Sequence, residues 1–275
     1  MKQIAVLGFG LIGASLAAAV RDARPEIRIA AIDLPGVVAS DAAQRLADEL
    51  VDSADRARVQ AVVEGSDLCV LAAPVGVIVA ELPALLERAS VVTDCGSTKR
   101  TICSAVQTSP RRGRFVAGHP MAGGPEGGAS QARSDLFRGQ TWLVCPESSD
   151  ADAVARVESL IALVGARSVH MAVEAHDRAV AYTSHAPQIL ASALALLASR
   201  ADATVAAGPA YRATTRSAGG AESMWRDIFS ANADAVAAVL RQLISELGTA
   251  AAGLEASPAD PSAALALLAE ARVRR

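Results

Sequence analysis

The stretch that decides the fold is Val6-Leu7-Gly8-Phe9-Gly10-Leu11-Ile12-Gly13-Ala14-Ser15, directly behind the short apolar run Gln3–Val6. Three glycines at this spacing, between an apolar strand and a helix, are typical of the first turn of a dinucleotide-binding βαβ unit. Gly8 permits a sharp turn off the strand. Gly10 has no Cβ, so the backbone can approach a pyrophosphate, and Gly13 lets the helix pack closely on the sheet.

The helix that follows these glycines supplies the second half of the prediction. It begins near Leu11 and Ile12, and its first N–H groups and positive dipole end would face the phosphates. Asp33 lies twenty residues after Gly13 and closes a second apolar run, residues 27–32. A carboxylate there hydrogen-bonds the adenosine ribose hydroxyls and repels a 2′-phosphate. No arginine follows immediately, so the predicted cofactor is NAD rather than NADP. The alternative is a glycine turn that serves packing alone.

Composition bounds the class of protein. The chain has 275 residues, a hydrophobic content of 52% and a net charge of −3, which gives no reason to expect nucleic acid or a membrane surface as partner. The four cysteines show neither CxxC nor ligand-like spacing, so reduced thiols in a cytoplasmic protein fit best. The histidines do not cluster with cysteines or carboxylates, and no metal site is predicted.

Further apolar runs predict a doubly wound parallel sheet of the Rossmann type. Strands at 68–73, 91–94 and 115–118 run into three loops, which contain Ala73 and Pro74, Ser97 and Lys99, and His119. Ligands of open α/β sheets bind beyond the carboxyl ends of strands, so these residues are expected at the edge that carries the glycine turn. Ala73 and Pro74 are predicted to contact the cofactor. Two more strands are expected at 141–145 and 167–171.

The chain changes character near residue 173. Residues 175–199 and 222–254 are rich in alanine and leucine, with helical periodicity and no strand pattern. We therefore predict a nucleotide-binding domain over 1–172 and an all-helical substrate and dimerisation domain over 173–275. The apolar content of these helices exceeds what one face of an isolated bundle needs, which predicts a homodimer through this domain.

Hydride removal from an alcohol carbon requires a base for the hydroxyl proton, and histidine suits this role because its ordinary pKa lies near the working pH. His119 is the strongest candidate, since it follows a strand in a glycine-bounded loop. His170 lies in an apolar strand and reads as structural. His176 opens a helix, where capping or solvation would explain it, and His185 lies on a helix of the second domain.

Several separate motifs resemble the prephenate and arogenate dehydrogenases of tyrosine biosynthesis, a branch of aromatic amino acid biosynthesis. They lie in the same order along nearly the whole chain. They are Gly8–Gly13, Asp94-Cys95-Gly96-Ser97-Thr98-Lys99, Gly118-His119-Pro120-Met121-Ala122-Gly123, Ser184-His185-Ala186-Pro187-Gln188, and Thr215-Arg216 with Met224-Trp225-Arg226-Asp227-Ile228.

This resemblance implies oxidative decarboxylation of a cyclohexadienol, with hydride transfer to NAD and loss of the ring carboxylate as carbon dioxide. By the same likeness His119 accepts the proton of the ring hydroxyl, and Ser97 hydrogen-bonds that hydroxyl or orients His119. Arg216 would bind a substrate carboxylate, and His185 would help to hold the substrate between the domains. Ser97 could instead cap a helix beginning at Thr98, and Arg216 could be a surface ion-pair partner.

Lys99 is one of two lysines in a chain whose other basic residues are arginine, which suggests a role for its ammonium group in substrate binding. The alternative is an ordinary surface lysine. Trp225 reads as a core residue rather than a platform for the substrate.

The chain departs from the family pattern after Gly123. Gly124 and Pro125 precede Glu126, so the loop is longer by one residue. Glu126 is still expected to face the substrate side chain, where an acid would favour the amino group of arogenate over the keto group of prephenate. Prephenate is the leading substrate, and arogenate or an amino-substituted prephenate analogue is the alternative.

Two other classes of function fit the first domain. A β-hydroxyacid dehydrogenase or imine reductase also combines a Rossmann unit with a helical domain. The hydroxyacid enzymes use a lysine of the helical domain, and this chain has none there. A nucleotide-sensing dimer would bind NAD without turnover.

Overall fold

A computed structural model describes residues 1–124 and 126–274, so Pro125 of the lengthened loop lies outside the described residues. The described part contains one eight-stranded sheet with the order β3-β2-β1-β4-β5-β6-β7-β8. The strands are β1 Gln3–Leu7, β2 Arg28–Asp33, β3 Glu49–Asp52, β4 Leu68–Leu71, β5 Val92–Asp94, β6 Phe115–Pro120, β7 Thr141–Cys145 and β8 Arg167–His170. The sheet is the Rossmann-type scaffold that the glycine pattern predicts.

Strand direction departs from the prediction of a parallel sheet at one boundary. Neighbouring strands from β3 to β6 are parallel, whereas β7 pairs antiparallel with β6, through His119 opposite Leu143 among other pairs. β8 in turn is parallel to β7. The carboxyl ends of the six strands β1 to β6 therefore meet at one edge, and β7 and β8 end at the opposite edge.

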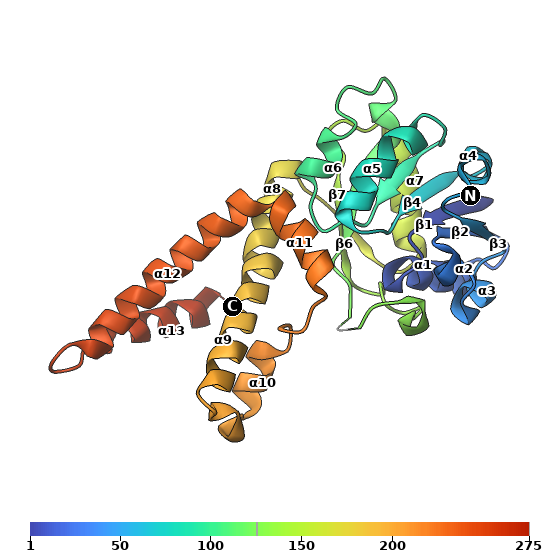
Figure 1. Cartoon of the computed structure of the whole chain (residues 1–275). Coiled ribbons are helices and arrows are strands. Elements are labelled where there is room, and N and C mark those ends of the chain that lie inside the picture. The colour runs from blue at the N-terminus through green and yellow to red at the C-terminus, as the bar shows by residue number, and fades with distance from the viewer. Residues whose placement is uncertain (125, 275) are drawn as a thin grey trace.

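Helices cover both faces of the sheet (Figure 1). They are α1 Leu11–Ala23, α2 Pro35–Val38, α3 Asp41–Leu46, α4 Arg56–Glu64, α5 Val75–Leu86, α6 Arg100–Ser104 and α7 Ala151–Leu163. One apolar cluster joins α1 and α7 to the sheet around Leu16, Val157 and Trp142, all fully buried. A second joins α4, α5 and α6 to the other face. The helices α1, α4, α5, α6 and α7 thus bury apolar residues against the sheet, whereas α2 has no buried residue.

Two glycines of the first turn are required by close packing. Gly8 has a φ of +94°, and a Cβ at this position would lie 2.6 Å from the carbonyl carbon of Ala72. A Cβ on Gly13 would lie 2.0 Å from the carbonyl oxygen of Gly8. Only glycine therefore lets α1 start so close to β1 and β4, as the sequence predicts.

The second half of the chain is helical, as expected. Its elements are α8 Val173–Val180, a π-helical segment Ala181–His185, α9 Ala186–Arg200, α10 Pro209–Thr215, α11 Glu222–Ala231, α12 Ala233–Glu255 and α13 Ser262–Arg274. Figure 1 shows α9 with α10, and α12 with α13, as two arms that project away from the sheet. The arms share a small buried cluster, Ala181, Ala186, Val236 and Val239.

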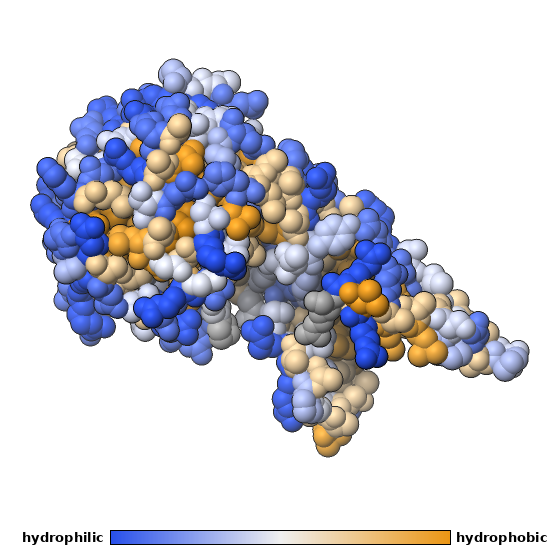
Figure 2. Space-filling view, turned by 180° about the vertical axis from the view of Figure 1, so that it is seen from behind, coloured by the Kyte–Doolittle hydropathy of each residue, from blue (hydrophilic) through white to orange (hydrophobic). Residues whose placement is uncertain are grey.

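Many apolar side chains on these arms are exposed. Leu197, Ile244 and Leu247 are 63%, 69% and 53% exposed, and Figure 2 shows hydrophobic residues at the surface of the projecting helices. Among the described residues one helix, α12, is long and apolar enough to cross a membrane by length and composition alone, with 11% of its apolar window buried.

Candidate active site

The carboxyl edge of the sheet carries a cavity of about 620 Å³ between the two halves of the chain. Its floor is the start of α1 and the loops after β4, β5 and β6. Its wall is formed by Gly220, Ala221, Met224, Trp225 and Ile228. The cavity brings together seven of the predicted site residues, Gly10, Leu11, Ile12, Ala73, Pro74, Ser97 and His119, with Glu126 as an eighth at its mouth.

The nucleotide side of the cavity fits a phosphate-bearing cofactor. Gly10 precedes α1, whose N-terminus has no side-chain cap, so its first N–H groups are free for an anion. A Cβ on Gly10 would meet nothing within 4 Å, which marks open space beside the backbone. Gly8 and Gly13 do not line the cavity. They allow the close backbone packing that holds the turn against the sheet.

Asp33 lies at the end of β2, outside the lining of this cavity. Its two carboxylate oxygens accept hydrogen bonds from the backbone N–H groups of Phe9, at 2.5 Å, and Leu34, at 2.7 Å. The carboxylate is therefore fixed beside the glycine turn, where the sequence pattern requires a ribose contact.

His119 is the penultimate residue of β6, so it lies within the strand rather than in the loop that the sequence predicted after it. It is buried and lines the cavity. Its Nδ1 lies 3.0 Å from Nε2 of His176, and Nδ1 of His176 lies 2.8 Å from a carboxylate oxygen of Asp177. A carboxylate only accepts, so His176 donates through Nδ1 and accepts through Nε2. His119 then donates through Nδ1, and its Nε2 keeps a lone pair for a substrate proton.

The electrostatic surroundings of His119 and His176 keep both imidazole rings neutral. Burial, with the positive charge of Lys99 and the neighbouring His176 and His185, holds the pKa of His119 well below its usual value. Burial also lowers the pKa of His176, against the effect of its hydrogen bond to Asp177. For Asp177, burial raises the pKa, but hydrogen bonds from His176 and two backbone N–H groups lower it overall.

The role of His176 is a correction to the sequence reading, which treated it as a capping or solvated residue. It is fully buried against His119, as is Asp177 beside it. Adjacent His and Asp residues at a helix start give no signal of a partner 57 positions earlier in the chain. His170, by contrast, lies in exposed β8 and bonds Glu158 at 2.7 Å, so it is a surface residue rather than part of an apolar core.

Ser97 is half-buried and lines the cavity after β5, as expected. The helix-capping alternative finds no support, because α6 begins at Arg100 and the carboxylate of Asp177 accepts from the backbone N–H groups at its start. Ser97 is therefore available to a ligand.

Lys99 requires a correction, because it was expected to bind substrate. Its side chain is fully buried, and its ammonium group pairs with Asp94 and donates to the carbonyl of Gly118 at 2.5 Å. It does not line the cavity. Instead it ties the end of β5 to the residue before His119, which positions the imidazole.

The helical wall of the cavity requires a third correction, which concerns Trp225. Trp225, expected in a core, lines the cavity with Met224 and Ile228. The ring of His185 lies edge-on to it at 6.1 Å, buried behind the wall, while the neighbouring Ser184 reaches the cavity. His185 thus supports the wall rather than lining it, and burial lowers its pKa to about 4.

Glu126 and Arg216 occupy different places. Glu126 is exposed at the mouth of the cavity, whereas Arg216 is exposed at the end of α10 and lies outside the lining. In a single chain the expected carboxylate ligand Arg216 is therefore not brought to His119.

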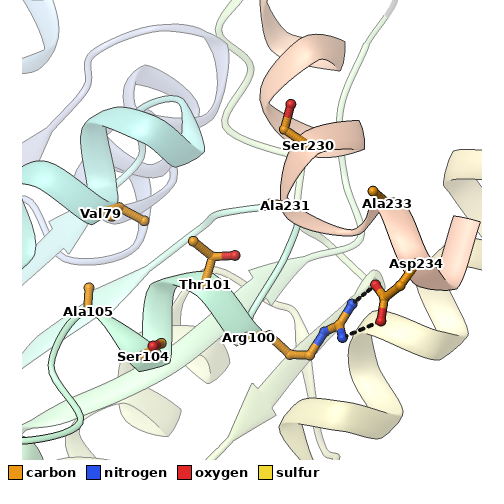
Figure 3. A pocket seen from close by; sticks show the side chains of 9 residues that line it. All are labelled: Val79, Arg100, Thr101, Ser104, Ala105, Ser230, Ala231, Ala233 and Asp234. Atoms are coloured by element: carbon orange, nitrogen blue, oxygen red, sulfur yellow. Dashed lines mark hydrogen bonds and ion pairs between the residues drawn. The ribbon is translucent and has the colours of Figure 1, made fainter.

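A second cavity, of about 630 Å³, lies where α5 and α6 meet α11 and α12 (Figure 3). The guanidinium of Arg100 faces the carboxylate of Asp234 there, with one N···O distance of 2.7 Å. Arg100 also donates to Asn232 at 2.8 Å and to Asp177 at 3.3 Å. An ionic contact therefore joins the two halves close to the histidine pair.

The fold and the cavity define a class: a Rossmann-type domain with a buried histidine at the carboxyl edge of its sheet and a helical half that closes the cavity, as in nicotinamide-dependent dehydrogenases. Comparison with known proteins makes the class specific. The profile of the prephenate dehydrogenase nucleotide-binding domain matches residues 16–170, and that of the prephenate dehydrogenase dimerization domain matches residues 172–265. The chain belongs to the prephenate dehydrogenase family.

Individual relatives agree. The chain is 29% identical to a cyclohexadienyl dehydrogenase of Zymomonas mobilis, over 90% of this chain and 86% of the relative. It is 32% identical to a prephenate dehydrogenase of Bacillus subtilis, over 86% and 66% of the two chains. The solved structure of a Synechocystis arogenate dehydrogenase superposes with a TM-score of 0.79 at 26% identity, over 99% of this chain and 98% of that one.

Proposed function

We propose that this protein is an NAD-dependent dehydrogenase that oxidatively decarboxylates prephenate to 4-hydroxyphenylpyruvate, a step of tyrosine biosynthesis. The observation that carries the proposal is the place of His119. Its ring lines the same cavity as the glycine turn, and its hydrogen bond to His176 leaves Nε2 free as a base. Membership of the family supplies the reaction class.

The residues present fit NAD. Gly10, Leu11 and Ile12 would hold the pyrophosphate at the start of α1, Ala73 and Pro74 would flank the nicotinamide half, and Asp33 would bind the adenosine ribose. Gly8 and Gly13 keep this turn close to the sheet. When bound, NAD supplies the acceptor for the hydride that leaves the ring carbon.

His119 would accept one proton from the substrate and later return it. Its neutral Nε2 accepts the proton of the ring hydroxyl while the carbon–hydrogen bond breaks, and returns it to the same oxygen when the ring becomes a phenol. The electron pair of the bond to the departing carboxylate completes the aromatic ring, and carbon dioxide leaves. Ser97, on the neighbouring loop, would hydrogen-bond the same hydroxyl.

Residues at the rim set the substrate. Glu126, at the cavity mouth, would face the side chain of the bound substrate. Its carboxylate would favour the amino group of arogenate over the keto group of prephenate. Arogenate or an amino-substituted prephenate analogue is therefore the alternative substrate. Arg216 and His185 stay predictions as substrate ligands. A carboxylate can be bound by Arg216 only if its segment moves or a second copy of the chain supplies it.

We also propose a homodimer through the helical domain, with the domain boundary between residues 172 and 173. The exposed apolar residues of the arms and the dimerization-domain match support this assembly. The four cysteines are free thiols, as a reducing cytoplasm would keep them, and we place the protein there.

The test is an initial-rate assay with purified protein. Prephenate and arogenate are each offered with NAD and with NADP, and reduced nicotinamide is followed by absorbance. We expect turnover with NAD and a higher kcat/KM for prephenate, and replacement of Glu126 by glutamine should lower any turnover of arogenate more than that of prephenate. NAD binding without turnover of either substrate would contradict the proposal and favour a nucleotide-sensing protein.

A further inference from the structure

Two carboxylates of the helical half reach the N-termini of helices in the sheet half. Asp177, on α8, accepts hydrogen bonds from the backbone N–H groups of Lys99, at 2.7 Å, and Arg100, at 2.9 Å, where α6 begins. Asp227, on α11, accepts from the N–H group of Gly76 at 3.2 Å, where α5 begins. Such contacts satisfy unpaired N–H groups and oppose the helix dipole, so both aspartates fasten the two domains together.

Asp177 differs from Asp227 in a second contact. The oxygen that accepts from Lys99 also accepts from Nδ1 of His176, and His176 accepts from Nδ1 of His119. The carboxylate is 1% exposed, so water does not compete for these bonds. One buried group therefore both fastens the domains and fixes which nitrogen of His119 carries a proton.

The charged groups around His119, His176 and Asp177 affect the protonation of His119 in opposite directions. Lys99 and His185 face His119 and disfavour the protonated imidazole, while Lys99 is itself paired with Asp94. Asp177 is faced by the guanidinium of Arg100, which also pairs with Asp234. The carboxylate of Asp177 is therefore the negative charge connected to His119 by hydrogen bonds, through a single intervening ring.

We propose that Asp177 is a positioning residue that acts through His176, so that His119 becomes a competent base only when the helical domain is docked on the sheet domain. The inference rests on the proposed function for its kinetic readout, and goes beyond it by making the helical domain part of the proton-accepting machinery. Asp177 thus has two proposed effects, the docking of the helical domain and the orientation of the His119 ring, and mutations can separate them.

Three variants make this separation. His176→Phe replaces the imidazole that links Asp177 to His119 with a phenyl ring that forms neither hydrogen bond, and it leaves the carboxylate of Asp177 at the start of α6. Asp177→Asn weakens both contacts. Asp227→Asn is the matched control, because it loosens the other domain-fastening contact and leaves the ring chain intact. For each variant kcat, its pH dependence, the KM for NAD and the thermal unfolding midpoint are measured.

We expect His176→Phe and Asp177→Asn to lower kcat about tenfold or more, with little change in the KM for NAD. The acid limb of the kcat/KM profile should move to lower pH in Asp177→Asn, because a negative charge that favours protonated His119 is lost. Asp227→Asn should keep kcat within about threefold and leave the limb in place, although its unfolding midpoint falls. Wild-type kcat in His176→Phe, or an equal loss of kcat in Asp227→Asn, would overturn the proposal.

A readout without turnover separates this inference from the proposed function. With ¹⁵N-histidine labelling, the four histidines of the chain give few enough signals to assign the protonation of each ring by NMR near pH 7.5. We expect His119 to carry its proton on Nδ1 in the wild type and in Asp227→Asn, and to lose this preference in His176→Phe. If the wild type turns over neither substrate, this pattern still supports the ring chain, and an unchanged His119 signal in His176→Phe overturns it.

Discussion

The two halves of the molecule treat their apolar residues in opposite ways. The sheet half buries two large clusters, one on each face, with residues such as Phe137 and Ile78 fully enclosed. The helical half encloses only a small cluster among the described residues and leaves leucines such as Leu247 and Leu268 more than half exposed. The first half buries its apolar residues within the single chain, whereas the second half leaves an apolar surface that a partner would cover.

The strongest test of this contrast compares one deletion in each half. Phe137→Ala should lower the free energy of unfolding by about 3–5 kcal/mol, because it opens a cavity beside Trp142 in the enclosed core. Leu247→Ala removes a side chain that is 53% exposed in the single chain, and at protein concentrations too low for association it should cost less than about 1 kcal/mol. Chemical denaturation measures both; equal losses would contradict the contrast.

The next effect concerns the base that the sheet half presents. His119→Asn should lower kcat at least about a hundredfold with little effect on NAD affinity, because the proton acceptor is lost while the glycine turn is untouched. His170→Asn is the control, since His170 lies in exposed β8 and far from the cavity lining. Comparable turnover in wild type and His119→Asn would refute the assignment of the base.

The next prediction concerns self-association through the helical half. Leu247→Glu places a charge on the exposed apolar side of α12 and should halve the mass of the particle in solution, as measured by light scattering. Leu50→Glu makes the same change on β3, where the leucine is 39% exposed, and should leave the mass unchanged. If the wild type is already monomeric at micromolar concentration, dimerisation does not explain the exposed apolar side chains of the helices.

The smallest effect is a shift in pH dependence. His119 must be unprotonated to accept a proton, and burial holds its pKa well below the usual histidine value. The kcat/KM profile should therefore stay flat as pH falls through about 6.5 and decline only at lower pH. A half-maximal point at 6.5 would show that the ring is not shielded as the structure describes.

Local spacing explains what the sequence could predict. The glycine turn, Asp33, Ser97 and His119 are each read from a few neighbouring residues, and the sheet brings the loop residues to one edge. The structure confirms the Rossmann-type sheet and the helical second half. β3 was missed because Glu49–Asp52 is a short edge strand with little apolar content, and a reversed β7 leaves no trace in hydrophobic pattern.

What the sequence could not show depends on contacts between distant segments. The pairing of His119 with His176 and the burial of Lys99 against Asp94 follow from how α8 and the loop after β5 meet, and no local pattern encodes them. Trp225 reads as core from its apolar neighbours, yet it lines the cavity because α11 stands over the sheet edge. Arg216 lies outside the cavity lining in the single chain, and its role as a substrate ligand stays a prediction.

We propose that the imidazole at the sheet edge and the closing helical wall form one site for oxidative decarboxylation. The decisive experiment follows reduced nicotinamide and released carbon dioxide together during turnover of prephenate with NAD. We expect the two products to appear in a one-to-one ratio, and we expect His119→Asn to suppress both alike. Reduced nicotinamide without carbon dioxide, or no product of either kind, would overturn this assignment.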